Sequence, residues 1–203
     1  MRIAYADPPY IGQAKAHYSH DPNCAEVDHN ELLKELCSYD GWALSASSPS
    51  LKQILCMSNC PDNVRVGAWV KPFASFKPGV NPAYAWEPVL FVPARKLGRE
   101  VSTVRDWVSA NITLQKGLSG VKPDEFSFWL FNILGMLPED EFIDMYPGSH
   151  AVTRARDKWV MQRPFVSLTQ RASDVDYCRC QLSFDELAVD FENKCLGCGH
   201  PRR

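Results

Sequence analysis

The pattern of apolar and polar positions predicts short strands alternating with amphipathic helices over residues 1–160. Short apolar runs bounded by turn residues indicate strands, and apolar positions recurring every three to four residues indicate helices. Strands are expected at residues 3–6, 42–46, 64–70, 86–92 and 141–146, the fourth broken by Pro88 and Pro93. Helices are expected at residues 30–39, from residue 48 onward, at 123–135 and at 151–159.

Start and stop signals support two of these helices. Asp28 and Glu31 have the spacing of a capping box at the start of the first helix. Pro123 opens the third helix and Gly135 ends it. Between them runs an apolar stripe of helical period, formed by Phe126, Trp129, Leu130, Ile133 and Leu134.

This order of elements predicts the fold class. Strands alternating with helices are typical of an α/β fold, here a Rossmann-like, mostly parallel sheet flanked by helices. The sheet is expected to be short, because few residues follow the last predicted helix. Composition changes near residue 167, which predicts a main domain at residues 1–166 and a small module at 167–203.

Composition and charge narrow the classes of function. No apolar run approaches the roughly 20 residues of a membrane span, and no secretory segment is visible, so we expect a cytoplasmic protein without a membrane partner. The net charge is -2, so a nucleic acid would have to bind local basic patches. Base contacts are expected within residues 94–120. Two clusters are candidates, and a solvated helix face is the alternative for each: Arg95, Lys96, Arg99 and Arg105, and Arg154, Arg156, Lys158 and Arg163.

Two pairs of cysteines near the end of the chain predict a structural zinc site. Cys178 and Cys180 form the first pair, and Cys195 and Cys198 the second. Four thiolates satisfy tetrahedral Zn2+ and leave no open position for catalysis. His200 is a substitute ligand, and free surface thiols are the alternative interpretation. The other four cysteines, Cys24, Cys37, Cys56 and Cys60, are interpreted as core or incidental thiols.

Asp7-Pro8-Pro9-Tyr10 is the most informative tetrapeptide, because it follows the first predicted strand. Open α/β sheets bind their ligands at the carboxyl ends of strands. The Asp7 carboxylate and the Pro8 carbonyl can accept hydrogen bonds from an amine, and the Tyr10 ring can stack on a base. A proline-rich turn capped by aspartate is the alternative.

A second segment suits a nucleotide-like cofactor. The strand ending near Asp144 runs through Tyr146 and Pro147 into Gly148-Ser149-His150 and then into a helix. Glycine allows close backbone approach, and a helix start offers free N–H donors. Taken alone, one glycine in a turn is also common in structural turns.

These residues together resemble a known family, the permuted (β-class-like) DNA amino-methyltransferases of phage and bacteria. In that family a catalytic Asp-Pro-Pro-Tyr precedes a cofactor motif Asp-x-Phe-x-Gly-Ser-Gly, and a Lys-Pro pair opens the helix before the cofactor motif. Here Asp7–Tyr10 comes first, Lys122-Pro123 opens the apolar helix, and Asp144–Ser149 follows. The segments 69–73 and 85–88 are also similar to phage adenine methylases. The resemblance covers roughly residues 1–160.

The resemblance implies S-adenosylmethionine-dependent methylation of N6 of adenine in DNA, in a bacterial or phage-infected cell. The implied catalytic residues are Asp7, Pro8, Pro9 and Tyr10. The implied cofactor-binding residues are Ala6, Asp7, Lys122, Asp144, Tyr146, Gly148, Ser149 and His150. Two departures stand out: His150 replaces the last glycine of the cofactor motif, and Asp174 and Asp176 are the sole candidates for a ribose-binding acid.

Three functions therefore stay open from the sequence. The first is a DNA adenine-N6 methyltransferase. The second has the same chemistry on cytosine N4 or on adenine in RNA, and the leading Asp7 favours adenine by family resemblance. The third is a catalytically decayed, zinc-containing protein that binds nucleic acid. A homodimer is also open, because a short sheet with exposed edges gains from pairing.

Overall fold

The computed structural model describes residues 1–12, 26–72, 80–98, 101–112 and 121–162. The chain divides into two units, of which the first comprises Met1–Leu97 and Thr103–Gln162. The second contributes three described residues, so the account below concerns the first unit. The predicted zinc ligands, the predicted ribose-binding acids and the expected boundary after residue 166 lie outside the described residues.

The first unit is built on a mixed sheet with the strand order β5-β3-β4-β2-β1-β6. The strands are β1 (Arg2–Ala6), β2 (Gly41–Ser45), β3 (Arg65–Val70), β4 (Trp86–Val92), β5 (Trp107–Ser109) and β6 (Glu141–Asp144). β1 pairs in parallel with β2 and β6, as β3 does with β5, whereas β4 is antiparallel to both β2 and β3. All the described strands except β4 therefore run in one direction, which confirms the α/β prediction.

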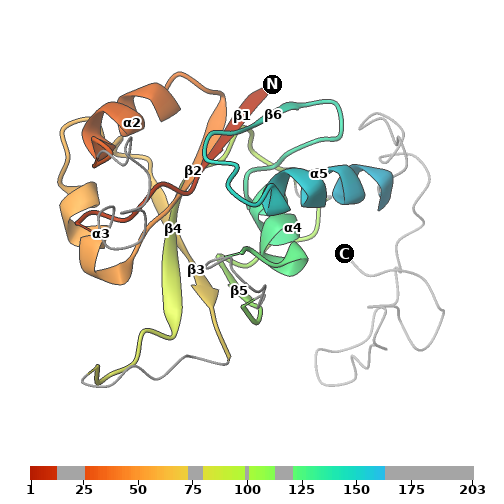
Figure 1. Cartoon of the computed structure of the whole chain (residues 1–203). Helices are drawn as coiled ribbons and strands as arrows, with labels where there is room; N and C mark the ends of the chain where they lie inside the picture. Colours follow the sequence, from red (N-terminus) through yellow and green to blue (C-terminus); the bar gives the residue numbers. More distant parts are fainter. Residues whose placement is uncertain (13–25, 73–79, 99–100, 113–120, 163–203) are drawn as a thin grey trace, which may run out of the picture. The chain divides into compact units, whose positions relative to one another are not determined.

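Helices cover both faces of this sheet (Figure 1). One face carries α2 (His29–Leu36) and α3 (Ser48–Leu55), and the other carries α4 (Asp124–Ile133) and α5 (Ala151–Gln162). The core accordingly forms two clusters, one on each face. Side chains of β1 alternate between them, because successive residues of a strand point to opposite faces: Ile3 and Tyr5 join the α4 side, and Ala4 and Ala6 the α2 side.

The position of β1 fixes where its following residues lie. Tyr5 of β1 pairs with Asp144 of β6, and Ala6 pairs with Leu44 of β2. Because these three strands are parallel, the chain leaves β1, β2 and β6 at the same edge of the sheet. Asp7 and the glycine turn after β6 are therefore neighbours, although more than 130 residues separate them in sequence.

The predicted helices occur close to their expected limits, with one difference at the first cap. The Asp28 carboxylate accepts hydrogen bonds from the backbone N–H groups of Asn30 (2.9 Å) and Glu31 (3.2 Å). The Glu31 side chain pairs with Lys34 at 3.1 Å instead of reaching back to Asp28. Half of the predicted capping box is therefore formed, and α2 ends at Leu36, three residues before the expected end.

The third predicted helix follows the pattern closely. The residues of the apolar stripe are buried in α4 or at its C-cap, and Gly135 has φ +66°, a left-handed conformation that glycine adopts without strain. Pro123 precedes the first helical residue. In the described part of the chain no helix has the length and apolar character needed to cross a membrane.

Two features of the sheet differ from prediction. β4 runs through Pro88, which was expected to break it. The Pro88 carbonyl accepts from Ala46 at the point where β2 ends, so the missing N–H of Pro88 removes no ladder bond from a central position. β5 was not predicted at all, because its three residues form a strand through pairing with β3 rather than through a pattern of their own.

Candidate active site

The Asp7 carboxylate lies at the carboxyl edge of the sheet beside a buried lysine. β1 ends at Ala6, and Pro8 and Pro9 cannot donate to a ladder, so the chain turns away at Asp7. Lys122 Nζ is 3.3 Å from Asp7 Oδ2. The Lys122 side chain is 5% exposed and that of Asp7 is 25% exposed, so the lysine is enclosed while the carboxylate still faces solvent.

A second carboxylate shares the same lysine. Glu87 of β4 lies with Oε2 3.2 Å from Lys122 Nζ, and its Oε1 accepts from Lys71, which follows β3. Trp69 pairs with Glu87 across the β3–β4 ladder, and both point to the α4 face. Asp7, Lys122, Glu87 and Lys71 therefore form a chain of alternating charge, called here the charge chain.

The indole of Trp69 forms the apolar floor of the charge chain. Lys71 Nζ lies 4.8 Å and Lys122 Nζ 5.0 Å from the Trp69 ring, distances at which a cation is attracted to the π face. The ring is 1% exposed, and its Nε1 donates to the Ala110 carbonyl at 2.9 Å. Both ammonium groups are thus held by a rigid, buried surface.

The surroundings raise the pKa values of some charged groups in this site and lower the pKa of another. Burial raises the pKa of Asp7 above its ordinary value; Lys122 opposes that effect, and Glu87 and Asp144 add to it. Burial lowers the pKa of Lys122, but Asp7 and then Tyr10, Tyr5 and Glu87 outweigh burial, so it lies well above the ordinary value. Burial also raises the pKa of Glu87, but Lys122 and Lys71 outweigh burial and leave it below its ordinary value.

Two tyrosines complete the surroundings of Asp7. Tyr10 is half-buried, and the negative charges of Asp7 and Glu87 act on its hydroxyl. Burial, with Asp7 and Glu87, raises the pKa of Tyr10 strongly, so the phenol is neutral. Tyr5 lies beneath the site, with its hydroxyl 2.8 Å from Ser45 Oγ. Neutral phenols and a partly open carboxylate suit the binding of an uncharged polar group.

The turn after β6 has the left-handed backbone that the sequence suggested. Gly148 has φ +43° and His150 has φ +56°, so the histidine adopts a conformation that non-glycine residues take at a cost. Thr153 Oγ1 donates to Asp144 Oδ2 at 2.9 Å, and Arg154 donates to the Ser149 carbonyl at 2.7 Å. These two bonds tie the start of α5 to the end of β6 and to the turn.

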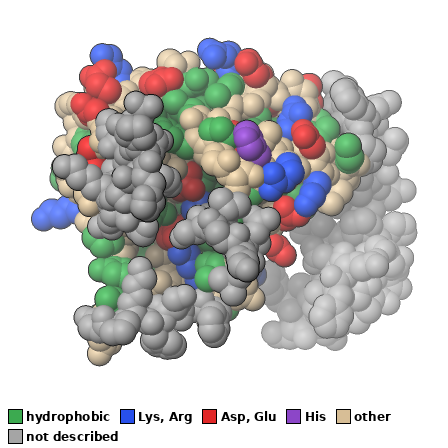
Figure 2. All heavy atoms as spheres, viewed as in Figure 1, with side chains coloured by type: hydrophobic (Ala, Val, Ile, Leu, Met, Phe, Trp, Pro, Cys, Tyr) green, Lys and Arg blue, Asp and Glu red, His purple; other side chains and the backbone are tan. Residues whose placement is uncertain are grey.

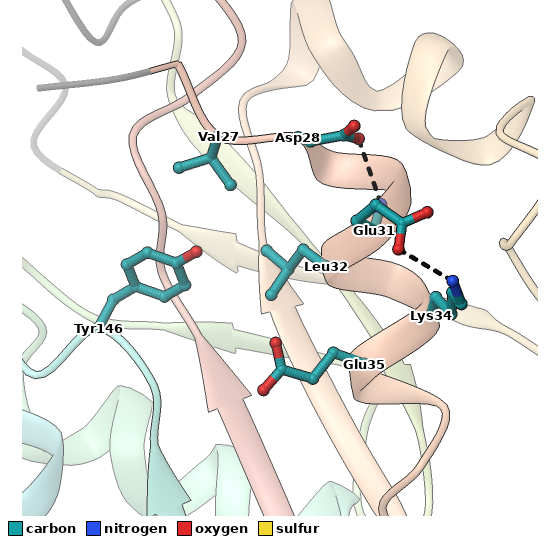
Figure 3. A pocket seen from close by; sticks show the side chains of 7 residues that line it. All are labelled: Val27, Asp28, Glu31, Leu32, Lys34, Glu35 and Tyr146. Carbon is teal, nitrogen blue, oxygen red and sulfur yellow. Dashed lines mark hydrogen bonds and ion pairs between the residues drawn. The ribbon is translucent and has the colours of Figure 1, made fainter.

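Two cavities adjoin the predicted cofactor residues. One, of about 410 Å3, lies between α2 and the Tyr146 ring, with Leu32, Glu31 and Glu35 on the helix side (Figure 3). The other, of about 350 Å3, is lined by Lys122 and Pro123 before α4 and by Ala151 and Arg154 in the first turn of α5. The predicted cofactor residues are thus brought to one edge of the sheet, with Tyr146 and Lys122 facing different cavities.

Sequence reasoning missed Glu87 and Lys71 as members of the site. Both extend a face that the pattern already marks as inward: Glu87 precedes Val89 and Phe91 by two and four residues, and Lys71 follows Trp69 by two. A charged residue in register with buried apolar positions needs a partner. That register was the available signal.

Several members of the predicted basic clusters contact other groups of the described residues. Arg95 pairs with Asp140 at 2.7 Å, and Lys158 pairs with Asp124 at 2.7 Å. The Arg105 guanidinium stacks on the ring of Trp107. Figure 2 shows Lys and Arg side chains interspersed with Asp and Glu on the face in view. Arg99 and Arg163 lie outside the described residues, as do the segments 13–25 and 113–120.

Comparisons with known proteins bear on the fold. No family model matches the chain, and no curated protein matches it either. Among solved structures, the M1.HpyAVI-SAM complex is similar, with a TM-score of 0.52, 13% identity and coverage of 78% of each chain. M1.HpyAVI itself gives a TM-score of 0.44 at 14% identity, covering 78% of this chain and 76% of that one. The chain has the fold of M1.HpyAVI. At this identity the likeness extends to the α/β fold and leaves the residue roles to be argued from the site.

Proposed function

We propose that the protein is an S-adenosylmethionine-dependent methyltransferase that acts on the exocyclic N6 amine of adenine in DNA. One observation carries the proposal. The partly open Asp7 carboxylate and the glycine turn after Asp144 leave neighbouring parallel strands at one edge of the sheet. An amine acceptor and a cofactor turn must be adjacent for direct transfer between them.

The turn after β6 fits the proposed cofactor. A Cβ added at Gly148 would find one atom of the described residues within 4 Å, the Tyr146 carbonyl at 3.9 Å, so this side of the backbone is open. The fold match to a protein crystallised with SAM supports the same cofactor. The residues that would hold it are Ala6, Asp7, Lys122, Asp144, Tyr146, Gly148, Ser149 and His150. The cofactor would supply an electrophilic methyl group on sulfonium.

The chain's own residues would bind and orient the acceptor. The target base leaves the DNA stack at a cost of about a few kcal/mol. Asp7 and the Pro8 carbonyl accept hydrogen bonds from its amine, and the Tyr10 ring stacks on its face. Two acceptors on one NH2 group draw the nitrogen lone pair out of conjugation with the ring. That lone pair is then available to the methyl group that the cofactor would supply.

The charge state of Asp7 suits this role. Transfer leaves the amine nitrogen with one proton too many, and a nearby base must accept it. Burial, Glu87 and Asp144 raise the pKa of Asp7, which makes its carboxylate a better proton acceptor than an exposed aspartate. Lys122 limits that rise and keeps the carboxylate available.

Asp7→Ala tests the proposal directly. Labelled methyl transfer from S-adenosylmethionine to DNA should fall by about 10²- to 10³-fold or more, because the amine loses its charged acceptor. Calorimetry should show that S-adenosylmethionine still binds with its affinity largely spared, because the other seven residues proposed to hold it, the glycine turn among them, are untouched. Asp62→Ala, which removes an exposed carboxylate, serves as the matched control and should keep full activity.

The acceptor is identified by mass spectrometry of nucleosides after the reaction. N6-methyladenine in DNA supports the proposal, whereas N4-methylcytosine or methylated RNA adenine would reassign the acceptor. Full transfer by Asp7→Ala would refute the role of Asp7. A wild-type protein that binds no S-adenosylmethionine would overturn the enzyme assignment and leave the non-catalytic nucleic-acid-binding alternative.

A further inference from the structure

Glu87 joins the two lysines of the charge chain. Its two carboxylate oxygens take separate lysines: Lys71 on Oε1 and Lys122, at 3.2 Å, on Oε2. Its negative charge also adds to the raised pKa of Tyr10. Its side chain is 17% exposed, so the lysine contacts are sheltered from water. Glu87 thus contacts the lysine that pairs with Asp7.

The geometry gives Glu87 a definite effect on Lys122. The ammonium lies 3.2 Å from Glu87 and 3.3 Å from Asp7, so it is shared almost equally between two carboxylates. An ammonium group has three donors, and without Glu87 the donor that it now takes would be free to turn toward Asp7. Asp7 would then be engaged by its own protein in the place where an amine has to bind.

The Trp69 floor restricts the alternatives. Both ammonium groups rest against one buried ring, at 4.8 and 5.0 Å, and that ring is fixed by its bond to Ala110. The lysines therefore cannot swing out to water without losing this contact. The positions of the carboxylates therefore decide which carboxylate each ammonium group contacts. Glu87 lies between Lys71 and Lys122.

We propose that Glu87 is a positioning residue for methyl transfer: it holds Lys122 away from full engagement with Asp7. This role rests on the proposed function, because it concerns the same site. Glu87 itself touches neither the acceptor amine nor the cofactor. It acts by leaving one Asp7 oxygen free for the amine.

A purely structural role for Glu87 makes different predictions. A counterion for two buried lysines would stabilise the fold, and its loss would lower the free energy of unfolding without changing the turnover of the molecules that fold. A positioning residue changes turnover at unchanged cofactor affinity. It also changes the pH dependence of turnover, because its charge acts on Asp7.

Glu87→Gln in the full chain is the central experiment. We expect kcat to fall about 10²-fold, the loss that follows when a reacting group is displaced by about 1 Å, with KM for S-adenosylmethionine within about twofold. The acid limb of kcat should move to lower pH, because the negative charge of Glu87 raises the pKa of Asp7 and glutamine lacks that charge. Glu87→Asp should restore part of kcat. Glu141→Gln removes the charge of an exposed glutamate at the amino edge of the sheet. This variant is the matched control and should change neither kcat nor the pH of the acid limb.

A second variant tests whether Glu87 acts through Lys122. In a Lys122→Met background, Glu87→Gln should lower kcat by about threefold or less, because interacting residues are not additive. An undiminished loss in that background would overturn the proposal, as would unchanged kcat and an unmoved acid limb in the single variant. If Glu87→Gln does not fold, Glu87→Asp must show the same shift of the acid limb with a smaller loss of kcat. A wild-type protein without transfer activity would instead refute the proposed function first.

Discussion

Two carboxylates, buried Asp140 and partly exposed Asp7, lie at opposite ends of the same pair of strands, and their surroundings differ. Asp140 directly precedes β6 and lies at the amino edge of the sheet; Asp7 directly follows β1 at the carboxyl edge. Asp140 accepts from the Arg95 guanidinium at 2.7 and 2.8 Å, from the Leu137 N–H at 2.8 Å and from the amino group of Met1 at 2.9 Å. Among the described residues, Asp7 pairs with one cation, Lys122, which it shares with Glu87.

The pKa values of the two groups record this difference. Burial alone would raise the pKa of Asp140, but the bonds from Arg95, Leu137 and Met1 outweigh burial and lower it to about 2. Burial dominates at Asp7, and its pKa is raised. A carboxylate whose lone pairs are all used stabilises the fold and has nothing left to bind. A carboxylate left short of donors costs stability and is ready for a ligand.

The largest expected effect comes from Asp140→Asn. The asparagine amide has nearly the shape of the aspartate carboxylate but carries no charge. Its NH2 group would also face N–H donors that the carboxylate accepts in the wild type. Breaking a buried ion pair by removing one partner costs about 3–5 kcal/mol, so the free energy of unfolding should fall by that amount in urea titrations at pH 7. Asp157→Asn, which breaks an exposed pair with Arg156, should change it by less than about 0.5 kcal/mol. A loss below about 1 kcal/mol for Asp140→Asn would show that the bonds of Asp140 do little to stabilise the fold at the amino edge.

Acid should reproduce part of this effect in the wild type. Because the folded pKa of Asp140 lies near 2 and its ordinary value is 3.8, its contribution is complete above pH 4 and is lost as the pH falls toward 2. The loss should amount to about 2 kcal/mol, since the side chain is 1% exposed and little screened. Chemical unfolding at a series of pH values measures this. The acid-dependent loss should shrink by the same amount in Asp140→Asn, and an unchanged pH slope in the variant would assign the loss to other groups.

The pattern of the sequence predicted the local elements well because each has its own signal. The α4 stripe, the glycine after it and the prolines after β1 are recorded in consecutive residues. β5 has no such record: it is three residues long, and β3 supplies its pairing. The expectation that Pro88 breaks β4 was wrong for the same reason. Whether a proline interrupts a strand depends on whether the neighbouring strand needs its N–H at that point.

Only part of the candidate site could be predicted from the sequence, because some of its residues have a local signal and others depend on distant partners. Asp7 and Gly148 occur in motifs, and the parallel order of strands brings them together. Glu87 lies in a segment similar to phage adenine methylases, but nothing in that segment marks it as a site residue. The partners of Glu87 and Arg95 lie 35 and 45 residues away along the chain. Arg95 was a candidate for a nucleic-acid patch, with a solvated helix face as the alternative, and the structure pairs it with Asp140. Charge alone does not distinguish a cation for a ligand from a cation for the core; that decision is made by long-range packing.

Of the two carboxylates compared, Asp7 should give the smaller effect on stability when it is changed to asparagine, and this result decides the comparison. Removing the charge relieves a carboxylate whose pKa burial raises, which favours the folded state at pH 7. Lys122 loses one partner in return but keeps Glu87 at 3.2 Å, so the two effects offset each other. The free energy of unfolding should therefore change by less than about 1 kcal/mol, within the range of ordinary surface substitutions, while methyl transfer is lost. Urea titration alongside Asp140→Asn makes the contrast direct, because the chemical change is identical and the two sites differ in their donors and in their exposure. If Asp7→Asn lowered the free energy of unfolding as much as Asp140→Asn does, both carboxylates would serve to stabilise the fold. The carboxyl edge would then have no carboxylate left to bind an amine.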